Sequence, residues 1–62
     1  MKYEKYLKIP DPHEALKAIA LSEALGLNEI EEAVALYAEI HGITTEEMAY
    51  YPNGERVLQP PF

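Results

Sequence analysis

The chain has 62 residues, of which 48% are hydrophobic and 26% charged, with no cysteine and a formal net charge of −6. This length allows one domain with a small core, the composition excludes a disordered chain, and the lack of cysteine excludes disulfides. The charge is uneven: three lysines against one glutamate give the first eight residues +2, which leaves −8 for residues 9–62. No stretch is apolar enough to span a membrane and no signal-peptide pattern precedes the start, so we expect a cytoplasmic protein.

Residues 1–9 predict a short N-terminal strand or arm. Their side chains alternate loosely, with one side formed by Tyr3, Leu7 and Ile9 and the other by Lys2, Glu4, Tyr6 and Lys8. A two-residue period is typical of a strand, and the two prolines that follow end it. Such a strand needs a partner. It can pair with residues 56–58 of the same chain as a β-ribbon, or with its own copy in a second subunit, and the sequence leaves both open.

A first helix is predicted over residues 12–25. Asp11 is a good N-cap and Pro12 suits the first helical turn, where a missing backbone N–H costs nothing. Alanine and leucine dominate the segment, and both favour a helix. Gly26 follows and suits a left-handed position that ends a helix.

A second helix is predicted over residues 29–41, with Asn28 as its N-cap, and a short third helix over residues 45–51. Apolar residues recur in the second helix at three- and four-residue spacing, and Tyr37 belongs to that stripe. Gly42 ends it. Thr44 followed by Glu47 is the pattern of a capping box, in which each residue satisfies a backbone amide of the other.

Residues 52–62 are expected to form a turn and a tail. Residues 1–62 therefore predict a single small, mainly α domain: a two-helix hairpin plus a short third helical turn, with a short N-terminal β-strand. No pattern of nucleophile and base, no glycine-rich phosphate loop and no cluster of metal ligands is present. We expect no catalysis, no cofactor and no metal. His13 is expected to be exposed, and His41 to complement the dipole of the second helix.

The leading hypothesis is a small acidic protein that acts by binding another protein, as an inhibitor, adaptor or accessory subunit. Aromatic side chains outside the helix pair supply apolar area at low ordering cost, and acidic side chains attract a basic partner. The predicted partner carries a basic or apolar patch. The predicted anchors are Tyr50, Tyr51 and Phe62, and the predicted steering charges are Glu29, Glu32, Glu39, Glu46 and Glu47.

The order strand, proline-containing break, helix, Gly26-Leu27-Asn28 turn and helix resembles that of the ribbon-helix-helix proteins, over roughly the first forty residues. The resemblance implies a homodimer whose paired strands lie in the DNA major groove, and an alternative function as a repressor or antitoxin. The DNA-binding residues it implies are Lys2, Lys5, Lys8 and Tyr6. The core it implies consists of Leu7, Ile9, Leu16, Ile19, Leu25, Ile30, Val34 and Tyr37. Glu29, Glu31 and Glu32 depart from the pattern, because they would face DNA phosphates.

Overall fold

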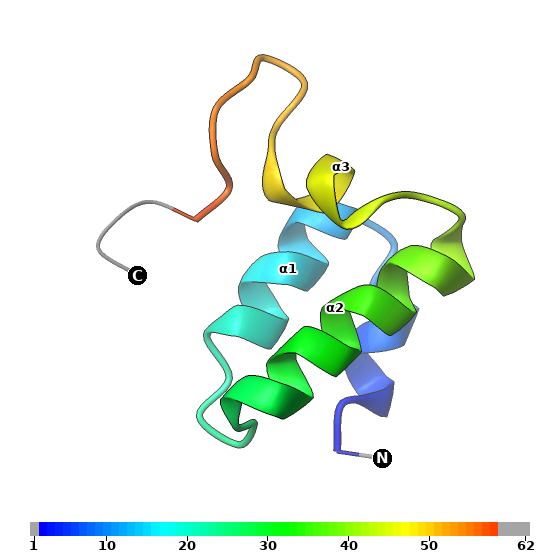
Figure 1. The fold of residues 1–62 in the computed structure, drawn as a ribbon, viewed down its shortest axis with the longest axis vertical. Coiled ribbons are helices and arrows are strands. Elements are labelled where there is room, and N and C mark those ends of the chain that lie inside the picture. The colour runs from blue at the N-terminus through cyan, green and yellow to red at the C-terminus, as the bar shows by residue number, and fades with distance from the viewer. Residues whose placement is uncertain (1, 59–62) are drawn as a thin grey trace.

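The chain is mainly helical, and the computed structural model, which describes residues 2–58, contains no strand in that range (Figure 1). A 3₁₀ helix, η1 (Glu4–Lys8), precedes three α-helices, α1 (Pro12–Ala20), α2 (Leu27–His41) and α3 (Thr45–Ala49). The helices α1 and α2 lie side by side, α3 crosses one end of the pair, and η1 packs against both long helices. Beyond α3 the chain turns at residues 52–54 and returns through one antiparallel bridge between Tyr50 and Arg56.

The predicted N-terminal strand is wrong, and with it the β-ribbon. Residues 4–8 form η1, in which Tyr6 donates its amide to the Tyr3 carbonyl at 3.0 Å. Helix α2 supplies donors to two carbonyls that a ribbon would have used for pairing. The His41 ring lies 2.8 Å from the Leu7 carbonyl, and the Tyr37 hydroxyl donates to the carbonyl of Ile9. Side-chain bonds from a neighbouring helix have therefore replaced the ladder of a ribbon.

Helix α1 begins as predicted but ends five residues early, at Ala20. The Asp11 carboxylate accepts the amide of His13 at 2.9 Å, which confirms Asp11 as the N-cap. The early end follows from Ser22, whose hydroxyl accepts the Ala24 amide at 3.3 Å. Serine bonds of this kind compete with the helical pattern. The chain leaves the helix there and turns Leu25 back into the core.

Helix α2 begins two residues before its predicted start, and its N-cap is Gly26 rather than Asn28. The Glu29 carboxylate accepts the Gly26 amide at 3.1 Å. The helix ends as predicted, at Gly42, which has a left-handed φ of 69°. The third helix is also confirmed, and it ends at Ala49, two residues before the predicted end.

The core consists of two buried clusters joined by half-buried Leu7 and Val34, which pack against both. The larger cluster lies where α1, α2, α3 and the C-terminal segment meet, and comprises Ala15, Leu16, Tyr37, Ala38, Met48 and Val57. The smaller one lies where η1 and the α1–α2 loop cover the helix pair, and comprises Tyr3, Ile19, Leu25 and Ala33. Within residues 2–58 no helix is long and apolar enough to cross a membrane.

Candidate functional site: a tyrosine-lined groove

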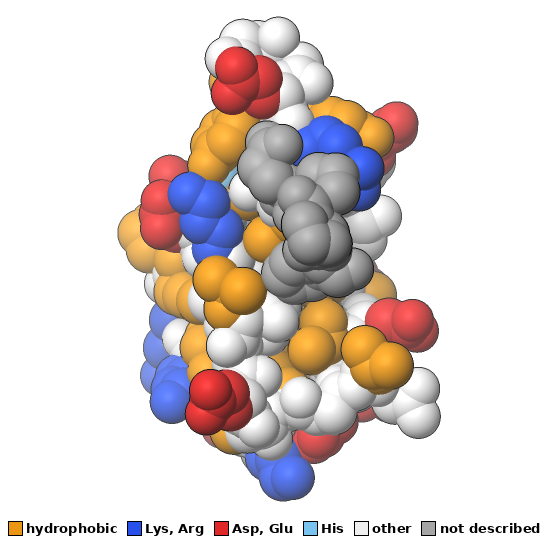
Figure 2. Space-filling view, turned by 90° about the vertical axis from the view of Figure 1, so that its left-hand side faces the viewer, with side chains coloured by type: hydrophobic (Ala, Val, Ile, Leu, Met, Phe, Trp, Pro, Cys, Tyr) orange, Lys and Arg blue, Asp and Glu red, His pale blue; other side chains and the backbone are white. Residues whose placement is uncertain are grey.

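A shallow open groove of about 400 Å³ lies between the start of α1 and the segment that leaves α3. We call it the tyrosine groove; its lining residues are Pro12, His13, Ile43, Glu47, Tyr50, Tyr51 and Pro52. Three separate parts of the chain contribute to it, so it exists only when α3 is docked on α1. Figure 2 shows hydrophobic side chains lying among acidic and basic ones on the face turned to the viewer.

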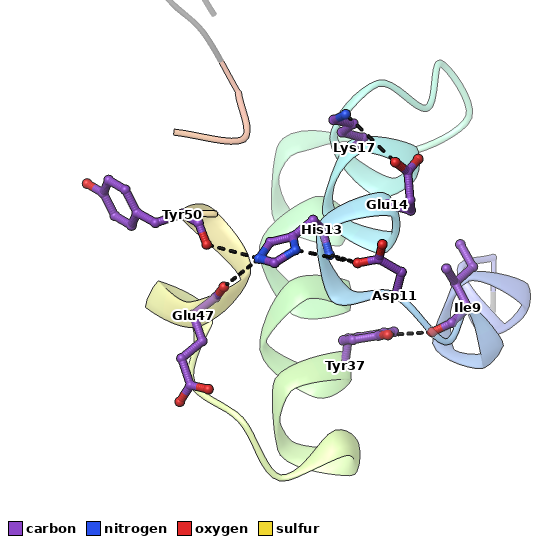
Figure 3. A network of polar contacts seen from close by, with 8 residues as sticks. All are labelled: Ile9, Asp11, His13, Glu14, Lys17, Tyr37, Glu47 and Tyr50. Atoms are coloured by element: carbon purple, nitrogen blue, oxygen red, sulfur yellow. Dashed lines mark hydrogen bonds and ion pairs between the residues drawn. The ribbon is translucent and has the colours of Figure 1, made fainter. Parts of the chain in front are cut away.

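His13 fixes the geometry of the groove. Its Nε2 lies 3.2 Å from the Glu47 carbonyl and 2.9 Å from the Tyr50 carbonyl, as Figure 3 shows. Carbonyl oxygens only accept hydrogen bonds, so Nε2 carries a proton and donates. The other ring nitrogen, Nδ1, lies 3.5 Å from the Asp11 carboxylate. The His13 side chain is only 19% exposed, so the prediction of an exposed histidine is wrong. This one ring joins the start of α1 to the end of α3.

Tyr51 forms an inner wall of the groove. Its ring centroid lies 5.0 Å from that of His13. The ammonium group of Lys17, a residue of α1, lies 5.6 Å from the centroid of the Tyr51 ring. Tyr51 raises the pKa of Lys17 through its hydroxyl group, with smaller contributions from Glu14 and Asp11. The ring also packs against the larger core cluster. Tyr51 is therefore held by contacts on several sides.

Tyr50 forms the outer rim and is 42% exposed. Its backbone is extended, with φ −128° and ψ 139°, so its side chain and that of Tyr51 point in different directions. Figure 3 shows the Tyr50 ring directed away from His13, while the Tyr50 carbonyl faces the imidazole. The two predicted aromatic anchors thus border the same groove, but the Tyr51 ring is held by its neighbours whereas the Tyr50 ring is exposed.

The predicted steering charges do not form one cluster. Glu47 lines the groove, and Glu46 precedes it on α3. Glu29 and Glu32 lie in the half of α2 that is remote from α3, whereas Glu39 lies in the last turns of that helix (Figure 1). Three of the five also have structural tasks, since Glu29 accepts the Gly26 amide, Glu32 accepts the Tyr3 hydroxyl at 3.4 Å and Glu47 accepts the Thr44 amide at 3.3 Å. Phe62 lies outside the described residues.

The residues of the DNA-binding alternative lie on and before η1. Lys2 forms an ion pair with Glu29 at 3.8 Å, and Tyr6 donates its hydroxyl to Ser22 at 3.1 Å. Lys5 and Lys8 are exposed and three residues apart, which places them on one side of a 3₁₀ helix. Since η1 is not a strand, this alternative lacks the element through which it was expected to read DNA. DNA binding and homodimerisation stay predictions.

Four groove residues were not predicted from the sequence as site residues: Pro12, His13, Ile43 and Pro52. The only signal for them was that each precedes or follows a helix end, where chain segments tend to meet. Among the described residues, no group of three or more histidine, aspartate or glutamate side chains is placed to hold a metal ion. No family model, curated protein or solved structure matches the chain. The groove itself is therefore the basis for a functional proposal.

Proposed function

We propose that this protein acts by binding another protein, as a small accessory, adaptor or inhibitory subunit, and that the tyrosine groove is its docking site. The observation that carries the proposal is the pairing of a fixed aromatic wall, Tyr51, with an exposed aromatic rim, Tyr50, on one concave surface. Tyrosine is enriched among the residues that dominate binding energy at interfaces. A concave surface lined by aromatic and proline side chains is typical of a recognition site.

Preorganisation supports the proposal. Binding loses affinity when loops and side chains must be ordered as the complex forms. Here the bonds from His13 to two carbonyls hold the end of α3, and the contacts of Tyr51 with His13 and Lys17 hold the inner wall. A partner would have to order little beyond the Tyr50 ring. Most of the apolar contact energy is then available for affinity.

The charge of the chain indicates what kind of partner fits. Residues 9–62 carry a net charge of −8. Acidic residues in or next to the groove segments are Asp11, Glu46, Glu47 and Glu55, against the basic residues Lys17 and Arg56. A basic and partly apolar surface would be attracted before contact and would meet complementary charge on docking.

The test is a selection from an unbiased displayed peptide library against the immobilised protein. Selected peptides are then measured against Tyr50→Ala and against Leu27→Ala, which removes a side chain that is 80% exposed at the far end of α2. We expect peptides that bind wild type and Leu27→Ala alike and bind Tyr50→Ala about tenfold more weakly, which corresponds to about 1.4 kcal/mol. Failure to obtain any Tyr50-dependent peptide would refute the groove as a docking site.

A further inference from the structure

We infer that the occupant of the tyrosine groove is an extended, proline-rich segment flanked by basic residues, bound in the polyproline II conformation. This inference rests on the proposed function and specifies the partner. A groove of this kind can receive a peptide in one of three recurring conformations. An added β-strand, an amphipathic helix and a polyproline II segment make different demands on the receiving surface.

Addition of a β-strand is blocked by the hydrogen bonds of the groove itself. A strand binds through free backbone amides and carbonyls at an edge. The carbonyls of Glu47 and Tyr50 already accept from His13, and the Tyr51 amide donates to the Glu55 carbonyl at 2.7 Å. The Tyr51 carbonyl accepts the Gly54 amide at 2.9 Å. A strand would have to displace these bonds, so recognition falls to side chains.

An amphipathic helix docks by laying a continuous apolar face, with anchors on successive turns, into a hydrophobic groove. The lining of the tyrosine groove is not continuous in this way, because His13 and Glu47 lie among its apolar side chains. A polyproline II segment makes a smaller demand, since it has three residues per turn and docks on a short aromatic-lined groove.

Polyproline II also suits a surface that offers few backbone bonds. The conformation has no internal hydrogen bonds and is held in advance by proline rings, so little entropy is lost when it binds. Proline rings present flat apolar faces, which pack on aromatic side chains such as Tyr50 and Tyr51 and on the facing Pro12 and Pro52. Aromatic-lined grooves are the recurring receptors of such segments.

Basic flanking residues are inferred from the carboxylates beside the groove. Glu46 is exposed and no ion pair within the described residues involves it, and the second oxygen of the Glu47 carboxylate has no bond to another described residue. Arg56 lies opposite Tyr50 in the antiparallel bridge, and its positive charge repels basic ligand residues on that side of the groove. The basic residues of the ligand are therefore expected at the α3 side of the groove, where the acidic residues are.

The decisive experiment follows amide chemical shifts of the isotope-labelled protein during titration with three synthetic peptides. The first alternates proline pairs with leucine and carries arginine at both ends. The second replaces every proline by alanine, and the third replaces every arginine by glutamate. We expect the first peptide to shift the amides of the groove residues, and each control to bind at least about fivefold more weakly. Binding should also fall about threefold in Glu46→Gln and remain unchanged in Glu31→Gln, a matched exposed position on α2.

Each contrary outcome separates this inference from the proposed function. If the alanine peptide binds as well as the proline peptide, or if none of the three binds while library peptides still require Tyr50, the polyproline inference is overturned and the docking site stands. If neither library nor synthetic peptides depend on Tyr50, both are overturned. Tyr50→Ala retains the backbone carbonyl that accepts from His13. Circular dichroism of the helices in this variant shows whether it folds.

Discussion

The bond from the Tyr37 hydroxyl to the Ile9 carbonyl offers the sharpest test of how α2 holds the N-terminal segment. Tyr37 is completely buried, and its ring stacks on that of His41 at 3.8 Å between centroids. Tyr37→Phe removes one oxygen atom and keeps the ring, so the packing of the larger cluster is preserved. The Ile9 carbonyl, which belongs to a half-buried residue, loses its donor. A lost bond of this kind costs about 1 kcal/mol.

That cost is a substantial part of the total. A chain of 62 residues has a free energy of unfolding of about 3–9 kcal/mol, at roughly 0.05–0.15 kcal/mol per residue. A change of about 1 kcal/mol in a domain of this size lowers the Tm by roughly 4–8 °C. The Tm is measured by circular dichroism of the helices, and urea unfolding checks that the slope with denaturant is unchanged.

The matched control is Tyr50→Phe, which removes the same atom from a side chain that is 42% exposed and donates no hydrogen bond within residues 2–58. Its Tm should stay within about 2 °C of wild type, since surface changes rarely exceed about 0.5 kcal/mol. Equal Tm values for the two variants would show that the Tyr37 hydroxyl contributes nothing and that η1 is held by other contacts.

Three further predictions concern pH, glycine conformation and capping. Burial raises the pKa of Tyr37 above 10.0, and burial together with Glu32 raises that of Tyr3. The folded state therefore favours the neutral phenols over the ionised ones. The stability that this preference contributes is complete below the unfolded pKa and is lost as the pH rises through the folded pKa values. Tm measured against pH should therefore fall less in Tyr3→Phe/Tyr37→Phe than in wild type. Gly42 has a φ of 69°, whereas Gly26 has a φ of −80° that any residue can adopt. In urea unfolding, Gly42→Ala should therefore cost roughly 1–2 kcal/mol, the penalty for a side chain in the left-handed region, and Gly26→Ala should cost less. Thr44→Ala should lower stability by about 1 kcal/mol through loss of its cap on the Glu47 amide, while Thr44→Ser should retain most of it; equal losses would exclude capping as the cause.

Helix ends with a local chemical cause were predictable from the sequence. The Asp11-Pro12 pair, the Thr44–Glu47 capping box and Gly42 act within a few residues of the chain, and all three appear where predicted. The start of α2 was misplaced because Asn28 is a better intrinsic cap than glycine, yet the Glu29 carboxylate stabilises the Gly26 amide instead. The intrinsic preference for asparagine therefore placed the start of the helix two residues late.

The N-terminal segment was not predictable, because its conformation depends on residues about thirty positions away. Loose alternation over a short segment fits a strand, but it also fits a 3₁₀ helix in which Tyr3 and Tyr6 are one turn apart. The partners of this segment decide between the two, and they are Tyr37, His41 and Glu32 on α2. The tyrosine groove was predictable only in part. Tyr50 and Tyr51 were identified by residue type, whereas the contact of His13 with the end of α3 forms only when α1 and α3 pack together.

Both histidines hold a short element to a long helix by a bond to backbone oxygen: His13 to Glu47 and Tyr50, and His41 to Leu7. Every residue type carries that oxygen. Substitution at position 50 therefore leaves the His13 bonds in place, although the Tyr50 side chain borders the groove. The framework and this part of the recognition surface can be altered separately, so a library randomised at position 50 is a direct route to variants of this fold with new binding specificity.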